Sequence, residues 1–171
     1  MMNALSAKAA ATREKILRTA DELFYLRGYN ATGLDATIGA AGVTKNNFYY
    51  YVKSKEQLAV EVIEWHFDKV QAEMRSALSS KRTGPLERLF TILDVILTRH
   101  KAQYTQGHIC GCLFGNFTLE LSTDSRLARK KLNDVFRATA GFSADYWRKP
   151  CSAGKSTNTW KRTTKPKPFS V

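Results

Sequence analysis

One stretch decides the fold of this chain: Gly42–Leu58, which reads GVTKNNFYYYVKSKEQL. A glycine turn leads into a short polar segment, three tyrosines follow, and a Ser-Lys-Glu helix start closes the stretch. Lys and Asn side chains hydrogen-bond to base edges in the major groove of DNA, while Tyr hydroxyls and Lys ammonium groups bind phosphates. No catalytic constellation needs this order of residues, so the stretch is typical of an element that docks on DNA.

The residues before and after the turn predict the order helix, helix, glycine turn, short helix. Residues 12–27 carry apolar side chains at the i, i+3, i+4, i+7 spacing of one helix face, with Thr12 as the expected N-cap. Thr32 is expected to cap a second helix over about 33–40, and a third helix is expected over about 45–50. In such a helix-turn-helix the helix after the turn enters the groove.

The rest of the chain is also predicted to be helical. Ser54 and Gln57 match a capping box that opens a fourth helix, and Pro85 suits the first turn of a fifth. No segment has the period of a strand, so the fold class is all-α. The expected extents are 54–78, 85–104, 111–121 and 125–136. The fifth helix is expected to bury an apolar face formed by Leu86, Leu89, Phe90, Leu93, Ile96 and Leu97.

Composition limits the classes of function. With 171 residues and 43% hydrophobic content, the chain can form one packed domain or a small DNA-binding unit joined to a helical body. No apolar run approaches the ~18–20 residues of a membrane span, and the N-terminal residues lack the apolar segment of a secretory signal. The chain has three cysteines, Cys110, Cys112 and Cys151. An odd number at this spacing does not suit a set of disulfides, which favours a reducing cytoplasm.

The net charge of +12 is unevenly distributed. Residues 148–171 contain seven Lys and Arg and no Asp or Glu, which leaves +5 for residues 1–147. A positive charge indicates a polyanionic partner, but the local pattern of residues 42–58 is the stronger indication. Prolines, Ser, Thr and Lys dominate after Arg148, so we expect a disordered tail there. The expected sections are a helix-turn-helix DNA-binding domain over 1–57, a helical body over 58–147 and a basic tail over 148–171.

The composite spacing over residues 12–58 resembles the signature of TetR/AcrR-type transcriptional regulators. That resemblance implies a cytoplasmic all-α homodimer whose N-terminal domain binds a palindromic double-stranded DNA operator and whose C-terminal domain binds a small inducer. It implies no cofactor, no catalytic residue and no membrane, so we do not expect an enzyme. The matching residues are Thr12, Ile16, Ala20, Leu23, Phe24, Gly28, Tyr29, Thr32, Ala41, Gly42, Val43, Thr44, Phe48, Tyr49, Ser54, Lys55, Glu56 and Leu58.

The resemblance also assigns roles within the third helix. It implies base contacts by Lys45, Asn46 and Asn47, and a core position for Phe48. Thr37 departs from the family pattern, which has an apolar residue at this core position. A polar side chain there could weaken the packing unless its hydroxyl bonds to the backbone one turn earlier. The alternative is that the tyrosines pack and that Lys45 is a solvated charge. Further DNA-binding candidates, to phosphate through helix N-termini or hydroxyls, are Thr32, Thr44, Tyr49, Tyr50, Tyr51 and Lys55.

Cys112 is the second point of interest. The run Gly111–Asn116 resembles a segment in one branch of the same family, in which the corresponding cysteine senses electrophiles or oxidants or lies beside a small ligand. A helix beginning near Cys112 would favour its thiolate, whereas a buried, inert thiol is the alternative. Zinc binding by Cys110, Cys112, His100 and His108 is a further alternative, although Cys-x-Cys is not the usual zinc spacing. Aromatic candidates for a ligand cavity are Trp65, Phe67, Phe90, Phe114 and Phe117, although such a stripe is more often plain core, and the sequence does not identify which of them face a pocket.

The C-terminus conflicts with the family pattern. Family members end in two long helices that form the dimer, whereas residues 148–171 are polar and rich in proline. A truncation, a frameshift or an expression artefact would explain this, and each would leave apolar surface on the body uncovered and dimerisation in doubt. The favoured hypothesis is a repressor released from its operator by a small ligand or electrophile. The alternatives are a defective fragment with weak nonspecific DNA binding and a small cysteine-dependent enzyme.

Overall fold

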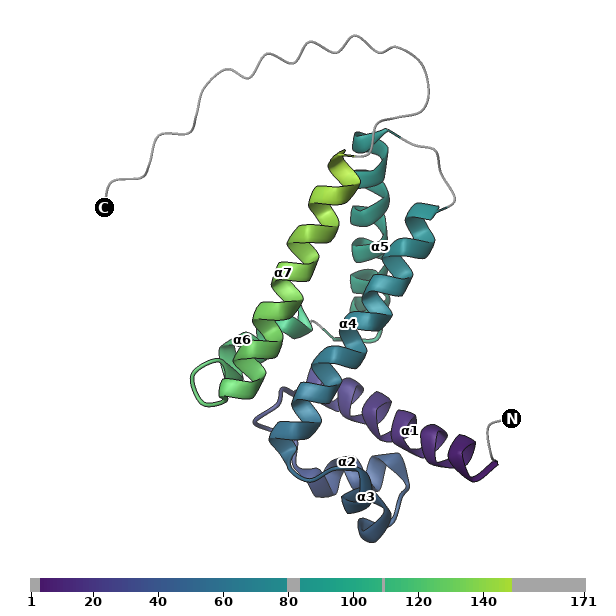
Figure 1. The fold of residues 1–171 in the computed structure, drawn as a ribbon, viewed down its shortest axis with the longest axis vertical. Helices are drawn as coiled ribbons and strands as arrows, with labels where there is room; N and C mark the ends of the chain where they lie inside the picture. Colours follow the sequence, from purple (N-terminus) through teal and green to yellow (C-terminus); the bar gives the residue numbers. More distant parts are fainter. Residues whose placement is uncertain (1–3, 80–83, 109, 149–171) are drawn as a thin grey trace.

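The computed structural model of this chain describes residues 4–79, 84–108 and 110–148. Within these ranges it consists of seven α-helices and no strand, which confirms the all-α prediction (Figure 1). Among the described residues, no helix is both long enough and apolar enough to cross a membrane. The helices are α1 (Ala4–Arg27), α2 (Leu34–Ala41), α3 (Lys45–Tyr51), α4 (Lys55–Ser79), α5 (Pro85–Thr105), α6 (Leu113–Leu121) and α7 (Arg126–Arg148).

The helices form a head and a body joined by α4. Helices α1, α2 and α3 make up the head at one end of the molecule, and α4 leads from it into the body beside α5 and α7 (Figure 1). The short helix α6 packs on α7 and on α1, so it lies where the body meets the head. We use head for residues 4–54 and body for the described residues from α4 onward.

One apolar core runs through both parts. Phe24 of α1, Ile63 of α4 and Phe117 of α6 are all buried in the same cluster, which also includes residues of α2, α3 and α7. The rings of Phe24 and Phe117 meet edge to face, with centroids 5.8 Å apart. Removing apolar surface from water is the main favourable term in folding, so the position of the head on the body is stabilised by the same burial that stabilises each part.

Helix α1 begins earlier than its apolar period predicts. The Thr12 hydroxyl donates to the carbonyl oxygen of Lys8 at 2.9 Å, so Thr12 lies inside the helix and its prediction as an N-cap is wrong. The segment before it, residues 4–11, contains five alanines. Alanine has the highest helix propensity of all residues, and this propensity extends the helix without an apolar face.

Helix α7 continues past the predicted end at Phe136, to Arg148. The prediction stopped where the apolar period faded, but Ala138 and Ala140 are strong helix formers and no proline precedes Pro150 in this segment. The disordered tail was predicted over residues 148–171; Arg148 is instead the last residue of α7, and residues 149–171 lie outside the described residues.

The prediction of a buried apolar face on α5 is wrong. Leu86 is 64% exposed, Phe90 56% and Leu97 53%, and Leu93 and Ile96 are exposed as well. Helix α5 packs on α4, but these side chains remain exposed. Periodicity identifies an apolar face but not the element that buries it. The result agrees with the expectation of uncovered apolar surface on the body.

Candidate nucleic-acid interface and body cavity

A glycine turn and a threonine cap set the direction of α3. Gly42 ends α2 in the left-handed conformation (φ 58°, ψ 41°), which a side chain would disfavour, and its N–H donates to the Gly39 carbonyl oxygen at 3.1 Å. Two residues later, the Thr44 hydroxyl oxygen accepts the backbone N–H of Asn47 at 3.2 Å and caps α3. Thr44 therefore acts through the backbone of the helix that follows it.

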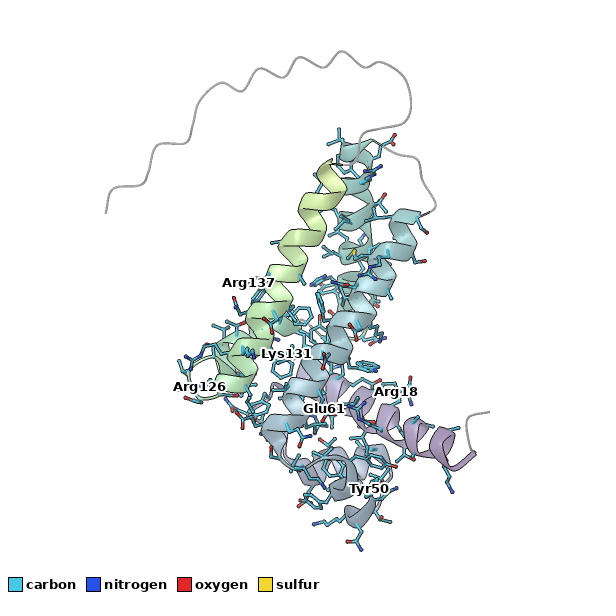
Figure 2. All side chains as sticks on the ribbon, viewed as in Figure 1. Arg18, Tyr50, Glu61, Arg126, Lys131 and Arg137 are labelled. Atoms are coloured by element: carbon cyan, nitrogen blue, oxygen red, sulfur yellow. The ribbon has the colours of Figure 1, made fainter. Side chains whose placement is uncertain are left out.

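Phe48 fixes α3 in the head. Its ring is fully buried, as predicted. The two following tyrosines face outward, with Tyr49 45% and Tyr50 73% exposed, and Tyr50 lies at the end of the molecule farthest from the body (Figure 2). Tyr51 is half-buried against the core. Its ring meets the Tyr50 ring edge to face, with the ring centroids 4.9 Å apart. The three tyrosines thus divide into two exposed rings and one packing ring.

The three predicted base-reading side chains are exposed together at the start of α3. Asn46 and Asn47 face solvent, and the Lys45 ammonium lies 2.9 Å from the carboxylate of Asp35 in α2. This hydrogen bond raises the pKa of Lys45, which keeps it charged. Both side chains are exposed, and an ion pair in water contributes little to stability, so a DNA partner can replace Asp35 at little cost.

Thr32 is not available to a phosphate in this structure. Its side chain is 1% exposed, and its hydroxyl lies 2.8 Å from the Gly28 carbonyl oxygen and 3.3 Å from that of Leu23. Gly33, not Thr32, occupies the N-cap of α2, so the capping prediction is wrong. The shorter of these two contacts is to the carbonyl oxygen of Gly28, the residue that follows α1, so the hydroxyl bonds back toward α1 and does not cap α2.

Thr37 behaves as predicted for a polar side chain in a core. It is fully buried, and its hydroxyl donates to the Gly33 carbonyl oxygen one turn earlier at 3.3 Å. The hydrogen bond removes the penalty of burying an unpaired hydroxyl. The core of the head therefore tolerates this departure from the family pattern.

Two lysines after α3 are already bonded within the chain. The Lys55 ammonium donates to the Asn30 carbonyl oxygen at 3.3 Å and lies 4.3 Å from the centre of the Tyr29 ring. Burial lowers the pKa of Lys55. Lys55 thus has a structural role in binding Asn30 and Tyr29. That it also contacts a DNA phosphate stays a prediction.

Lys53 was absent from the predicted set. Its ammonium donates to the carbonyl oxygens of Tyr49 at 3.3 Å and Tyr50 at 3.5 Å, at the C-terminal end of α3. The signal in the sequence is a lysine just after a short helix, where a positive charge binds the last carbonyls. Lys53 thus helps to hold the C-terminal end of the helix that carries the exposed asparagines.

The body contains a cavity of about 420 Å³ between α1, α4, α5, α6 and α7. Its wall is mainly apolar, and none of its described lining residues is Asp or Glu. The polar side chains on the wall include two imidazoles and a guanidinium. The apolar lining residues are Phe67, Val70, Met74, Ile92, Ile96, Leu113, Phe114, Val135 and Phe136, and the polar ones are Tyr25, His66, Gln71, Arg99, His100, Cys112 and Thr139.

The polar side chains on the α1 side of the cavity are held in place. His66 Nδ1 lies 2.8 Å from Asp21 Oδ1, and both side chains are nearly buried. The carboxylate accepts, so Nδ1 carries hydrogen and Nε2 is the nitrogen left for another partner. The Tyr25 hydroxyl donates to the Gly111 carbonyl oxygen at 2.7 Å, and burial raises the pKa of Tyr25, which keeps it protonated.

Cys112 lies where the cavity wall meets α6. It is exposed, occupies the N-cap position of that helix and makes no capping hydrogen bond through its sulfur. The alternative of a buried thiol is therefore wrong for Cys112, while Cys110 is half-buried. No group of three potential metal ligands occurs among the described residues, which leaves the zinc alternative without a site there.

Only two of the five aromatic candidates line the cavity. Phe67 and Phe114 do, and their rings meet edge to face with centroids 6.2 Å apart. Phe117 is in the core and Trp65 packs against that core, as the alternative of plain core predicts, whereas Phe90 faces outward and fits neither interpretation. Helical spacing alone does not tell a cavity wall from a core.

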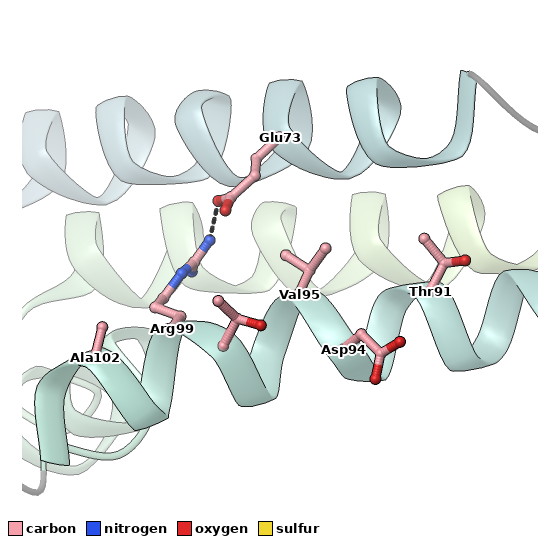
Figure 3. A pocket seen from close by; sticks show the side chains of 7 residues that line it. Glu73, Thr91, Asp94, Val95, Arg99 and Ala102 are labelled. Carbon is pink, nitrogen blue, oxygen red and sulfur yellow. Dashed lines mark hydrogen bonds and ion pairs between the residues drawn. The ribbon is translucent and has the colours of Figure 1, made fainter. Parts of the chain in front are cut away.

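A second hollow of about 420 Å³ lies along α5, next to α4 (Figure 3). Arg99 lines both hollows and extends toward Glu73 of α4, with which it forms an ion pair. Asp94 and Thr91 make this second wall more polar than the first. Because the Arg99 charge is already paired, it contributes less to either hollow than an unpaired guanidinium would.

Comparison with known proteins places this architecture. Residues 16–62 match the family described as "Bacterial regulatory proteins, tetR family". The chain belongs to the TetR family. An uncharacterized HTH-type transcriptional regulator in the lacX 3' region of Lactococcus lactis subsp. lactis is 33% identical over 128 residues, 73% of this chain and 62% of that protein.

Two further relatives cover similar spans of this TetR-family chain. The HTH-type transcriptional repressor DhaR of Mycobacterium sp. (strain GP1) is 30% identical over 124 residues, 72% of this chain and 59% of that protein. The crystal structure of E. coli NemR in its reduced form superposes with a TM-score of 0.67 at 27% identity, covering 80% of this chain and 69% of NemR. The chain thus spans about three fifths of the length of these curated relatives. They are named as transcriptional regulators, in agreement with the prediction that this chain is not an enzyme.

Proposed function

We propose that the chain is a DNA-binding transcriptional repressor that reads its operator with α3. The observation that carries the proposal is the start of α3, where Lys45, Asn46 and Asn47 are exposed together on a helix fixed by the buried Phe48 and capped by Thr44. Lys suits guanine O6 and N7, and Asn suits adenine N6 and N7. Tyr49 and Tyr50 are exposed on the same helix, where their hydroxyls can reach phosphates.

Selection of bound sequences from random DNA, followed by footprinting, tests this proposal. We expect a pseudo-palindromic site whose half-sites lie one helical turn apart, ~34–36 Å, or a multiple of it. A dimer would make the second half-site contact intramolecular and so increase affinity. Enrichment of no sequence would contradict operator reading and favour the alternative of a fragment with nonspecific binding. Protection of one isolated half-site would contradict the homodimer that we propose from the family.

We further propose that the body cavity holds an inducer, which is largely apolar and carries a hydrogen-bond acceptor or a negative charge. Support comes from the aromatic and aliphatic wall, the His66 and His100 side chains, and the lack of any described carboxylate on it, while Arg99 adds a guanidinium that is already paired with Glu73. An organic cation would meet no opposite charge among the described lining residues. A repressor of this kind works in the cytoplasm, which suits the free thiols of Cys110 and Cys112.

Cys112 gives a test of electrophile sensing. Its exposed sulfur lies on the cavity wall at the first turn of α6, so we expect iodoacetamide to modify it and to release the selected operator. Cys112→Ser should remain bound under the same treatment, and Cys110→Ser, at the half-buried thiol two residues away, should still be released. Gel shift with mass spectrometry of the adduct is the measurement. Full modification of Cys112 without release would contradict the sensing role.

A further inference from the structure

The exposed face of α5 has the repeat of a coiled-coil seam. Six side chains recur along it at alternating spacings of four and three residues, and all of them are exposed. Helices that pack against a partner helix along their whole length show this repeat, because a spacing of 3.5 residues keeps the side chains on one line. The residues of this line, which we call the α5 seam, are Leu86, Phe90, Leu93, Leu97, His100 and Tyr104.

The α5 seam lies on the side of the helix away from α4. Arg99 extends toward α4, where it forms an ion pair with Glu73 (Figure 3). Leu97, two residues earlier, is rotated by about 200° around the helix axis and so lies on the opposite side. A second helix can therefore reach the seam without displacing α4.

A second copy of the chain matches the seam when its α5 runs in the opposite direction. In that register the two helices overlap over their full length, Pro85–Thr105, and each side chain of the seam faces one from the other copy. The two-fold axis of such a pair passes beside Val95, the middle of α5. The facing pairs, each formed twice, are Leu86 with Tyr104, Phe90 with His100, and Leu93 with Leu97.

The charges beside the seam favour this antiparallel direction. Glu87, Asp94 and Lys101 follow one another at a spacing of seven residues, so they lie on the same flank of the seam. In the antiparallel pair, Glu87 of each copy lies beside Lys101 of the other, whereas a parallel pair would set one acidic half of α5 beside the other. The two Asp94 side chains meet at the two-fold axis and oppose the association. On the other flank, Ile96 meets Ile96 of the second copy.

The area of the seam limits the strength of the association. At about 200 Å² for a large side chain, the exposed fractions give roughly 600 Å² of apolar surface per copy. Two copies would bury roughly 1,200 Å², which is the lower end of the range for specific interfaces. We therefore expect a weak association that depends on concentration. The apolar side chains counted, on and beside the seam, are 39–71% exposed and comprise Leu86, Phe90, Leu93, Ile96, Leu97 and Tyr104.

We propose that the α5 seam binds the α5 seam of a second copy in the antiparallel direction. The C-terminal end of α5 adjoins the head, since the Tyr25 hydroxyl of α1 lies 3.2 Å from Gln103 Oε1. The two heads therefore lie at opposite ends of the pair and cannot occupy neighbouring half-sites of one operator. This association is distinct from the operator-binding homodimer proposed above, and it does not rest on DNA binding.

Analytical ultracentrifugation of the full chain without DNA tests the surface. The parent should associate reversibly at about 10–100 μM. The double variant Leu93→Gln, Leu97→Gln should weaken the association at least about 100-fold, because four leucines leave the interface. Both side chains are exposed in the single chain, so the double variant should keep the thermal unfolding midpoint of the monomer. The matched control is Leu127→Gln, at an exposed leucine of α7, which should associate as the parent does.

Two results of this experiment would overturn the proposal. One is a parent that stays monomeric at about 1 mM, the limit of weak association, as it would if another part of the chain occupied the seam. The other is equal association of the parent and the double variant, which would assign the contact between copies to a different surface.

Exchange of charges at low ionic strength tests the direction. Lys101→Glu should weaken the association about five- to ten-fold, and adding Glu87→Lys to the same chain should restore it. Glu87 also accepts the Gly84 N–H at the start of α5, so its replacement does not stabilise the helix and cannot itself cause the restoration. Asp94→Asn should strengthen the association, since it removes the repulsion at the two-fold axis. No restoration by Glu87→Lys, or no gain from Asp94→Asn, would overturn the antiparallel pairing.

Discussion

Phe48→Ala is expected to lower the free energy of unfolding by about 3–5 kcal/mol. The ring is fully buried, and it lies in the core that also contains Ile16 and Val62. Truncation leaves a cavity that the fixed helices on either side fill only in part. Because Phe48 also fixes α3, the variant should lose operator binding under conditions in which part of the chain still folds. Urea denaturation followed by circular dichroism measures the change.

The neighbouring Tyr50 provides the control for this variant. Its side chain is 73% exposed, so Tyr50→Ala should change stability by no more than about 0.5 kcal/mol. It should nevertheless weaken binding to DNA, since an exposed hydroxyl on α3 can reach a phosphate. A loss below about 1 kcal/mol for Phe48→Ala would mean that the site collapses around the smaller side chain, contrary to this expectation.

Asn47→Ala is expected to reduce discrimination at one operator base pair by ~1–3 kcal/mol, a factor of about five to 150. The side chain is exposed, while the Thr44 cap uses only its backbone N–H, which alanine retains. The helix start should therefore survive, and only the contact with the base should be lost. Competition binding to operators substituted one base pair at a time measures the effect.

Two variants show whether the loss is specific to base reading. Asn133→Ala removes a similar side chain from an exposed position of α7 in the body and should change neither affinity nor discrimination. Lys55→Ala should weaken binding to operator and random DNA alike and lower the salt dependence, because phosphate contacts carry no sequence information. Equal losses for Asn47→Ala on operator and random DNA would remove Asn47 from the base-reading set.

The head was predictable because its determinants are local. A glycine that must adopt positive φ, a threonine followed three residues later by the amide that it caps, and an apolar residue on the inner face all lie within the seven residues from Gly42 to Phe48. Thr32 shows the limit of such reasoning. A threonine before a helix is a good N-cap by position, but the Gly28 carbonyl oxygen, just after α1, competes for the same hydroxyl and binds it.

The parts that sequence did not predict are tertiary contacts between distant residues. Glu120 binds amides some ninety positions earlier in the chain, and the His66 imidazole binds Asp21 from another helix. Neither partner can be inferred from spacing, because periodicity reports the face of a helix and not its neighbour. The spacing of its apolar residues correctly predicts that α5 is a helix with one apolar face, but most of that face is exposed in the structure.

The continuous core has a consequence for protein engineering. When a regulator consists of separate domains, its DNA-binding domain can be exchanged with that of a relative. The fusion point is then placed after the last helix of the DNA-binding domain. Here such a fusion point near residue 57 would separate Phe24 from Phe117 and the Tyr29 and Asn30 amides from Glu120, all contacts across the junction. A working hybrid would need the donor's α6 together with its first three helices, so the transferable unit is discontinuous in sequence.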